Sequence, residues 1–255
     1  MTAAFHRFNV HAGRFFFRFR NALFPALFAA FLLALRPRAL FPFHPAADRF
    51  LRLAGFAIAL AGEGIRLATI GFEYIERGGK QGRVYASRLV NKGVYGISRN
   101  PMYVGNMLIA IGIVMVSGSP RAYWTVIPFF LFVYQAIVTA EEGFLREKFG
   151  KEYEEYCAAV PRFVPALRRV PEAFSGTRFN GRRPLKQDLS TLTWIAMVLI
   201  ALPAWRSVFL FGWEVSRARM VRTAVLELAV LFLYGGLAAL KKRRSPLFYD
   251  PGESR

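Results

Sequence analysis

Apolar residues along the chain occur in long blocks that are separated by short basic or turn-rich segments. Blocks of about 20 apolar residues are long enough to cross a bilayer as helices. The pattern therefore predicts an all-α, polytopic membrane bundle of five to six transmembrane helices. The first span is short unless the preceding aromatic stretch FFFRFRNALF extends it. The predicted spans cover residues 21–35, 50–72, 101–117, 122–140, 190–211 and 220–240.

Charge is distributed unevenly over the segments between these spans. The chain has 35 Lys and Arg against 16 Asp and Glu, a formal net charge of +19. With a cytoplasmic N-terminus and alternating spans, 25 basic residues lie on the cytoplasmic side, nine lie outside and Arg66 lies within a span. The positive-inside rule predicts this bias, and contact with an anionic leaflet adds to it. We therefore expect an integral protein of a bacterial inner membrane, with both termini cytoplasmic and no binding to nucleic acid.

Few of the usual cofactor and metal signatures are present. Cys157 is the only cysteine, and His6, His11 and His44 lack the spacing of metal ligands. The sequence also lacks G-x-G-x-x-G and Walker A motifs, so we expect no Rossmann domain and no metal site.

A tight turn at residues 117–122, rich in Gly, Ser and Pro, divides the middle of the chain. The spans on either side should form an antiparallel hairpin with its tip outside. At ~1.5 Å per residue, Asn100 and the pair Glu141-Glu142 then return to similar depth and become neighbours. The following segment, residues 141–165, is expected to be a helix that leaves the membrane and lies along it. The expected organisation is N-terminal helices (1–84), a core (85–166), a linker (167–188) and an appended hairpin with a basic tail (189–255).

The start of the third span combines a basic residue with helix-initiating residues. Asn is a favoured N-cap and Pro is favoured at the first helical position, so Asn100-Pro101 predicts a helix start with Asn100 as its cap. Free N–H groups of the first turn and the guanidinium of Arg99 would attract an anion. Tyr103 and Gly105 follow, and Gly105 would allow a ligand or another helix to approach closely. The alternative is that Arg99 serves topology, Asn-Pro serves capping and Gly105 serves helix packing.

Two adjacent carboxylates, Glu141 and Glu142, lie opposite this helix start. At the C-terminal end of a membrane span they oppose the helix dipole. They are either ion-paired with Arg99 or Arg146, or they accept hydrogen bonds from ribose hydroxyls or an ammonium group of a ligand.

These residues resemble the signature of a known family. The chain reads GVYGISRNPMYVG at 93–105, EEGFL at 141–145, FGKEYEEY at 149–156 and VPRFVP at 160–165. This resembles the integral-membrane methyltransferases that include isoprenylcysteine carboxyl methyltransferase and the phospholipid N-methyltransferases, whose pattern is G-x-Y-x-x-x-R-H-P-x-Y-x-G, then E-E-x-x-L and F-G-x-x-Y-x-x-Y. Asn100 stands where the best-known members have His, and we interpret it as a cap.

The resemblance implies that the cofactor is S-adenosylmethionine, bound between the cytoplasmic end of the hairpin and the segment that follows. It further implies methyl transfer to a lipophilic or small acceptor, such as an isoprenylcysteine-type carboxylate, a thiol or a lipid head group. Alternatives are an NADPH-dependent enzyme like the sterol reductases and a non-catalytic membrane scaffold. By position in the motifs, the implied cofactor-binding residues are Tyr95, Arg99, Asn100, Pro101, Tyr103, Gly105, Glu141, Glu142, Tyr153, Tyr156 and Arg162.

Glu142 and Arg66 are the candidate catalytic residues. An ionised acceptor needs no general base, whereas an amine would pass a proton to Glu141 or Glu142. Glu63 and Arg66 share a helix face within a predicted span, at i and i+3. Ionisable residues inside a membrane segment are costly and point to function. Either these two residues pair with each other, or Arg66 binds an acidic head group of the acceptor.

Overall fold

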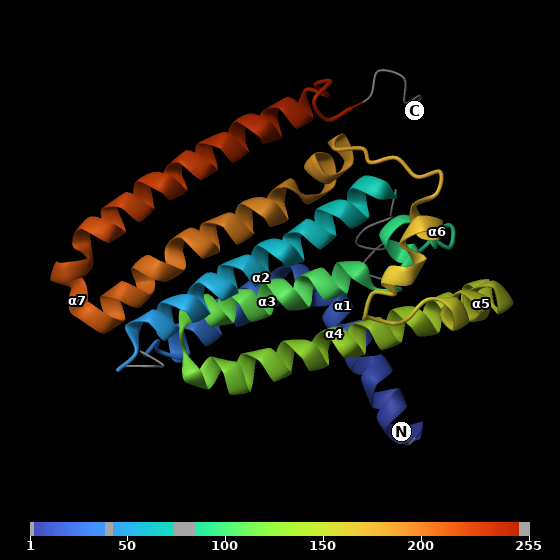
Figure 1. Cartoon of the computed structure of the whole chain (residues 1–255), viewed down its shortest axis with the longest axis horizontal. Coiled ribbons are helices and arrows are strands. Elements are labelled where there is room, and N and C mark those ends of the chain that lie inside the picture. The colour runs from blue at the N-terminus through green and yellow to red at the C-terminus, as the bar shows by residue number, and fades with distance from the viewer. Residues whose placement is uncertain (1–2, 39–42, 74–84, 250–255) are drawn as a thin grey trace.

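The computed structural model describes residues 3–38, 43–73 and 85–249. The predicted boundary at residue 84 and the basic residues Arg77, Lys80, Arg83 and Arg255 fall outside these ranges. Long helices run side by side along the molecule (Figure 1). In chain order the elements are α1 (Ala3–Ala34), α2 (Pro45–Phe72), the 3₁₀ turn η1 (Gly93–Gly96), α3 (Pro101–Ser117), α4 (Pro120–Phe149), α5 (Lys151–Ala159), the 3₁₀ turn η2 (Leu167–Arg169), α6 (Val170–Phe174) and α7 (Arg182–Lys242).

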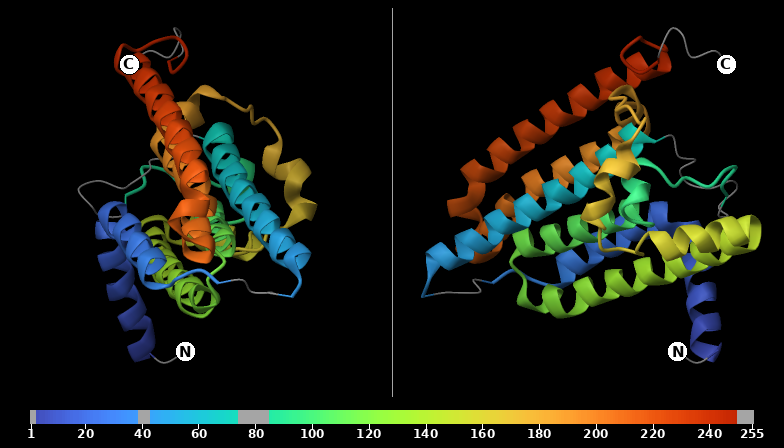
Figure 2. Two further views of the ribbon diagram at one scale, coloured as in Figure 1. Left: turned by 90° about the vertical axis from the view of Figure 1, so that its left-hand side faces the viewer. Right: turned by 45° about the vertical axis from the view of Figure 1, so that its right-hand side comes forward.

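The predicted membrane bundle is confirmed. Helices α2, α4 and α7 are each long and apolar enough to cross a membrane, and Ala22–Phe31 and α3 are shorter apolar helical stretches. Gly212 (φ 79°, ψ 171°) interrupts α7, and its two arms lie antiparallel as the last two predicted spans (Figure 1). The helix does continue through the aromatic stretch, because α1 is one helix from Ala3 to Ala34, but its apolar part is the shorter stretch Ala22–Phe31. Its N-terminal part stands across the bundle and its later part runs along it (Figure 2).

The predicted hairpin is formed by α3 and α4. Gly118 closes the C-terminus of α3 in the left-handed region (φ 65°), which a glycine adopts without a Cβ clash, and α4 begins at Pro120. The sequence placed Glu141 and Glu142 at the C-terminal end of a membrane helix, and this is corrected. The α4 helix continues through both residues to Phe149. Their neighbouring carbonyls are bonded within the helix, so the end of the helix dipole does not act on them.

The segment after Glu142 also differs from expectation. Gly150 (φ 51°) ends α4, and α5 starts at the next residue. Helix α5 folds back along α4, because Tyr153 and Tyr156 pack against Leu145 and Phe149, and Arg162, just past α5, reaches Glu142. One residue in the left-handed region interrupts the helix, but the N–H of Tyr153 bonds to the Gly150 carbonyl at 3.1 Å and starts the next one.

Two pairs of glycines bring α2 and α3 into close contact. A Cβ on Gly62 would lie 2.6 Å from the Gly105 carbonyl oxygen, and a Cβ on Gly112 would lie 2.5 Å from the Gly55 carbonyl oxygen. The two glycines of each helix are seven residues apart, about two turns, so they lie on one face. Small residues at such a crossing let two membrane helices pack backbone against backbone. Gly105 therefore serves helix packing, the second of its two predicted roles.

Gly62→Ala is expected to destabilise the protein by about 1–3 kcal/mol, because the added methyl group overpacks the α2–α3 contact. Gly64 is the matched control: it lies on the same helix, and a Cβ there meets nothing within 4 Å. Gly64→Ala should be neutral or stabilising, since Ala favours a helix over Gly by about 1 kcal/mol. Thermal unfolding in detergent checks both variants, and equal melting temperatures for the two would contradict the close contact.

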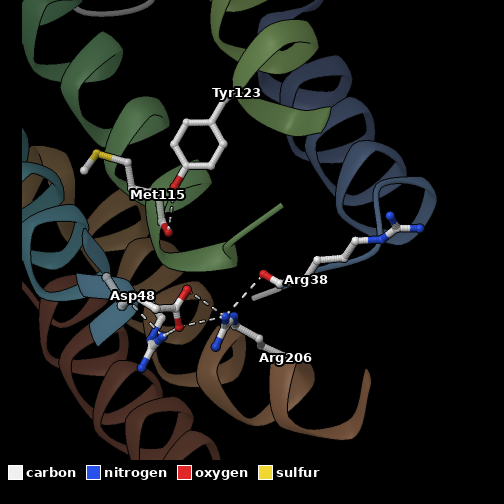
Figure 3. A network of polar contacts seen from close by, with 6 residues as sticks. Arg38, Asp48, Met115, Tyr123 and Arg206 are labelled. Carbon is white, nitrogen blue, oxygen red and sulfur yellow. Dashed lines mark hydrogen bonds and ion pairs between the residues drawn. The ribbon is translucent and has the colours of Figure 1, made fainter. Parts of the chain in front are cut away.

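Two buried ion pairs hold the first arm of α7 against α2. Near the turn between α3 and α4, Arg206 Nη2 lies 3.0 Å from Asp48 Oδ2, and it also donates to the Arg38 carbonyl at 3.3 Å (Figure 3). Arg52 also pairs with Asp48. Tyr123, close by, donates its hydroxyl to the Met115 carbonyl at 3.3 Å (Figure 3).

At the other end of the same contact, Arg66 of α2 pairs with Asp188 of α7 at 2.5 Å. Residues 48 and 66 are 18 positions apart, and so are 188 and 206. At ~1.5 Å per residue the two pairs are about 27 Å apart, close to the thickness of a bilayer core of about 30 Å. The two ion pairs therefore fix the register of α7 on α2 near the two ends of the membrane segment.

The segment predicted as a linker, residues 167–188, packs against the core over much of its length. A Cβ on Gly96 would lie 2.6 Å from the Ala173 Cβ, so α6 sits directly on η1. The ring of Phe72 makes edge contacts with Phe174 and Phe179, with centroids 4.7 Å and 5.3 Å apart. These contacts place α6 beside the start of α3.

Candidate functional site

The start of α3 is formed as the sequence predicts, but its cap works differently. Asn100 occupies the N-cap position, and its carbonyl accepts the N–H groups of Tyr103 and Val104 at 3.1 Å and 3.0 Å. Its side chain makes no capping hydrogen bond. Instead, Asn100 Nδ2 donates to Glu142 Oε1 and to the Arg162 carbonyl, both at 3.1 Å. The interpretation of the Asn100 side chain as a cap is therefore corrected: only its backbone caps, and the amide bridges α4 and the chain after α5.

Glu142 is the centre of this polar site. Its residue is 9% exposed, and its carboxylate lies 2.9 Å from Arg162 Nε and 3.6 Å from Arg99 Nη2. The predicted proximity of Asn100 and Glu142 is confirmed, and so is the ion-pair alternative with Arg99. Arg146, the other predicted partner of the Glu pair, instead lies over the Tyr153 ring, 5.9 Å from its centroid. One buried carboxylate thus faces two guanidinium groups and an amide.

The chain after α5 returns to the start of α3 and covers the site. The N–H of Arg99 bonds to the Pro161 carbonyl at 2.9 Å, and Ser98 Oγ donates to the Phe163 carbonyl at 3.1 Å. Arg162 Nη2 donates to Thr139 Oγ1 at 3.0 Å, so two nitrogens of the Arg162 guanidinium contact residues of α4. The covering role predicted for Arg162 follows from these backbone contacts.

The tyrosines of α5 form the wall beside Arg99. Tyr153 is 1% and Tyr156 is 8% exposed, and they pack with Val160 in a small apolar cluster. Tyr156 donates its hydroxyl to the Tyr95 carbonyl at 2.8 Å. Burial, reinforced by the Glu142 carboxylate, raises the pKa of Tyr153 well above its usual range, and burial likewise raises the pKa of Tyr156. Both phenols are therefore neutral hydrogen-bonding groups at physiological pH.

The charge on Arg99 is set by two opposing effects. Burial lowers the pKa of its guanidinium, but the Glu142 carboxylate together with Cys157 and Tyr153 more than offsets this, so the pKa of Arg99 is raised from its ordinary value. Arg99 thus remains a cation with a buried Nε that has no hydrogen-bond partner in the described part of the chain.

Glu141 lies apart from Glu142, although the two are adjacent in sequence. Tyr103 donates its hydroxyl to Glu141 Oε1 at 2.5 Å, and Arg20 of α1 donates to the Tyr103 oxygen at 3.4 Å. Arg20 is a functional candidate that the sequence analysis missed. Its only signal is an arginine enclosed by aromatic residues ahead of the first apolar run, which does not reveal where α1 will pack.

Arg66, one of the two catalytic candidates, is held by the chain itself. It is 3% exposed, its Nε donates to Glu63 at 3.1 Å, and its Nη2 donates to Asp188. Its Nη1 donates to Asn106 Oδ1. All three guanidinium nitrogens are thus occupied, which favours the predicted Glu63–Arg66 pairing over the binding of a head group. The sequence analysis missed Asp188, whose signal is a lone acid at the start of an apolar run.

The structure therefore brings most, but not all, of the predicted site residues together. Pro101 begins α3 beside the site, whereas Gly105 faces α2 and Arg66 lies in the α2–α7 contact. The residues that surround the Glu142 carboxylate or wall its partners are Tyr95, Arg99, Asn100, Tyr153, Tyr156 and Arg162.

A family comparison covers much of the part of the chain that forms this site. Residues 53–152 match the family model described as phospholipid methyltransferase. This segment contains α3, α4 and the Glu142 carboxylate, so the predicted resemblance to membrane methyltransferases is confirmed over it. Helices α1 and α7 lie outside the matched segment.

Individual relatives match over 79 to 92 residues of the chain. The chain is 33% identical over 79 residues to the cobalt-zinc-cadmium resistance protein CzcN of Cupriavidus metallidurans, covering 31% of this chain and 36% of that protein. It is 33% identical over 82 residues to protein-S-isoprenylcysteine O-methyltransferase of Schizosaccharomyces pombe, covering 31% and 34%. It is 26% identical over 92 residues to 7-dehydrocholesterol reductase of Danio rerio, covering 34% and 18%. The matches thus span about a third of the first two relatives and less of the third. No solved structure matches the chain.

Proposed function

We propose that this protein is an integral-membrane methyltransferase that moves a methyl group from S-adenosylmethionine to a lipophilic or small acceptor. The observation that carries the proposal is the buried Glu142 carboxylate, held by Arg99, Asn100 and Arg162 at the end of a tight helical hairpin. The carboxylate, Arg99 and Asn100 all lie in the segment that resembles phospholipid and isoprenylcysteine methyltransferases. By the positive-inside rule this end of the hairpin faces the cytoplasm.

The residues present fit the proposed cofactor. S-adenosylmethionine carries a carboxylate, an ammonium group, ribose hydroxyls and an adenine ring. Arg99 has a buried Nε without a hydrogen-bond partner in the described chain, which suits a carboxylate. Glu142 is an acceptor for an ammonium or ribose hydroxyl. The buried rings of Tyr153 and Tyr156 supply an apolar wall of the site, which suits the adenine ring. Each chemical group of the cofactor thus has a matching residue.

The chain's own contribution to the reaction is chiefly positional. S-adenosylmethionine supplies a methyl group that a nucleophile displaces from sulfur in line. Such a reaction needs two reactants held in register and water excluded. Arg99 and Glu142 would orient the cofactor, and the segment around Arg162 closes over them. Glu141 of α4, which accepts a hydrogen bond from Tyr103, can receive a proton if the acceptor is an amine.

A second candidate is an NADPH-dependent reductase, because a 7-dehydrocholesterol reductase is among the relatives. That match has lower identity and covers a fifth or less of the relative's length. The site favours the methyltransferase, since a zwitterionic amino-acid group needs both a carboxylate and a guanidinium, as at Glu142 and Arg99. A diphosphate linkage offers no cationic group to the Glu142 carboxylate.

Ligand-dependent thermal unfolding of the purified protein in detergent tests the choice. S-adenosylmethionine and S-adenosylhomocysteine should each raise the melting temperature by several degrees at saturating concentration, since a ligand at 100 times its Kd stabilises the folded state by about 2.7 kcal/mol. NADPH should leave it unchanged. Stabilisation by NADPH alone would replace the methyltransferase with the reductase, and no response to any of the three would favour a non-catalytic scaffold.

A further inference from the structure

The two adjacent glutamates of α4 face two different clusters. Successive residues of a helix point about 100° apart. Glu142 faces the start of α3 and the covering segment, through Arg99 and Arg162. Glu141 faces Tyr103 and, through it, Arg20 of α1. A second polar cluster, Arg20–Tyr103–Glu141, therefore lies directly beside the proposed cofactor site and is not needed to hold the cofactor.

The position of Arg20 is fixed by the packing of α1 on α4. Gly13 leaves no room for a Cβ against the Ala136 carbonyl, and the Phe24 ring meets the Tyr134 ring edge to face at 5.5 Å. Between these contacts, the Arg20 guanidinium stacks on the Phe17 ring, 4.0 Å from its centroid. Helix α1 thus carries a cation to the mouth of the hairpin and holds it there.

The charge of Arg20 is not neutralised by a direct ion pair in the described chain. Among the described residues no carboxylate oxygen lies within 4.0 Å of its guanidinium; its hydrogen bond to the hairpin goes to the neutral hydroxyl of Tyr103, behind which Glu141 also feels its charge. That hydroxyl commits its hydrogen to Glu141 and receives one from Arg20. The guanidinium is therefore oriented while most of its donors stay open. Such a fork matches a carboxylate or phosphate with two parallel hydrogen bonds.

The helix that carries Arg20 also exposes aromatic side chains. Phe15 and Phe19 are 53% and 45% exposed on the same helix. Exposed aromatic side chains on the same helix as an oriented cation suit an amphiphile with an anionic head and an apolar tail. We propose that Arg20 binds the anionic group of the methyl acceptor, so that the acceptor is a lipophilic carboxylate or phosphate ester. This inference rests on the proposed function, and it assigns the specificity to a helix outside the segment shared with the known methyltransferases.

Binding of model amphiphiles to the full chain, saturated with S-adenosylhomocysteine in detergent, tests the proposal. The probes are N-acetyl-S-farnesylcysteine, its neutral methyl ester and dodecyl phosphate. The unaltered protein should bind at least one of the two anions about tenfold or more tightly than the ester. Arg20→Gln should abolish this preference, and Arg20→Lys should retain part of it. Which anion binds better identifies the head group as carboxylate or phosphate.

Arg18→Gln is the matched control, because Arg18 is exposed two residues away and stacks on Phe19 instead of reaching Tyr103. It should keep the preference of the unaltered protein. An unchanged preference in Arg20→Gln, an equal loss in Arg18→Gln, or no preference in the unaltered protein would each overturn the proposal. Affinity for S-adenosylhomocysteine should be the same in all variants, which shows that they are folded. If the unaltered protein does not bind S-adenosylhomocysteine, the proposed methyltransferase function is itself contradicted.

Discussion

Glu142→Gln is expected to weaken the binding of S-adenosylhomocysteine by about 10- to 100-fold, because each hydrogen bond to a charged group contributes roughly 1.5–3 kcal/mol. Gln keeps the shape of the side chain but removes the charge that Arg99 and Arg162 share. The two guanidinium groups then lie unpaired, 3.6 Å and 2.9 Å from the substituted position, and their orientation towards a ligand is lost. Isothermal titration in detergent measures the change.

Glu147→Gln provides the control for this experiment. Glu147 lies on the same helix, five residues on, and is exposed, so removing its charge should leave affinity unchanged. Arg99→Ala should weaken the ligand as Glu142→Gln does, since the two residues form one site. If Glu142→Gln and Arg99→Ala both bind S-adenosylhomocysteine as the unaltered protein does, the cofactor site lies elsewhere.

Arg66→Met is expected to destabilise the protein by about 3–5 kcal/mol, the usual cost of removing one partner of a buried ion pair. Arg66 serves two carboxylates, Glu63 and Asp188, which are 3% and 0% exposed. Met is similar in length, so the change removes mainly the charge and the hydrogen bonds. Two buried carboxylates then lose the cation between them. Thermal or denaturant unfolding in detergent measures the loss.

The remaining contacts of the α2–α7 interface supply two comparisons. Arg206→Met should cost less than Arg66→Met, because Arg52 still pairs with Asp48. The triple variant Glu63→Gln, Arg66→Met, Asp188→Asn should recover much of the stability, since it buries no net charge. A triple variant as unstable as Arg66→Met alone would contradict an electrostatic origin. A stable triple variant that binds S-adenosylhomocysteine but no longer transfers methyl groups would restore the predicted role of Arg66 in binding the acceptor.

The prediction of the hairpin depended on strictly local information. Pro101 and Gly118 fix where α3 begins and ends, Pro120 fixes where α4 begins, and a constant rise per residue fixes which residues meet. Asn100 and Glu142 are therefore neighbours for a reason that can be read from the sequence. The end of α4 was misjudged because a change from apolar to charged residues marks the membrane boundary, whereas a helix continues until its hydrogen bonds are interrupted, here at Gly150.

The side-chain partners were harder to predict. Whether Asn100 caps with its amide or bridges to Glu142 depends on the distance between two backbones, and the covering segment brings the Arg162 carbonyl to compete for that amide. Gly105 had two predicted roles, and the choice between them depended on where α2 packs. These contacts join segments that are far apart in the sequence, and the loops between them do not determine which residues come to lie opposite each other.

By itself, the sequence determined the helical membrane segments, the antiparallel pairing of α3 and α4 and the meeting of Arg99, Asn100 and Glu142, because hydrophobic length, turn residues and helical rise act over short stretches. Only the tertiary structure decided that Glu141 faces Tyr103 and Arg20, that Asp188 joins Arg66, and that α7 is fastened to α2 near both ends. These outcomes depend on how each helix is rotated and packed against distant parts of the chain, and side-chain complementarity across the whole bundle fixes that rotation.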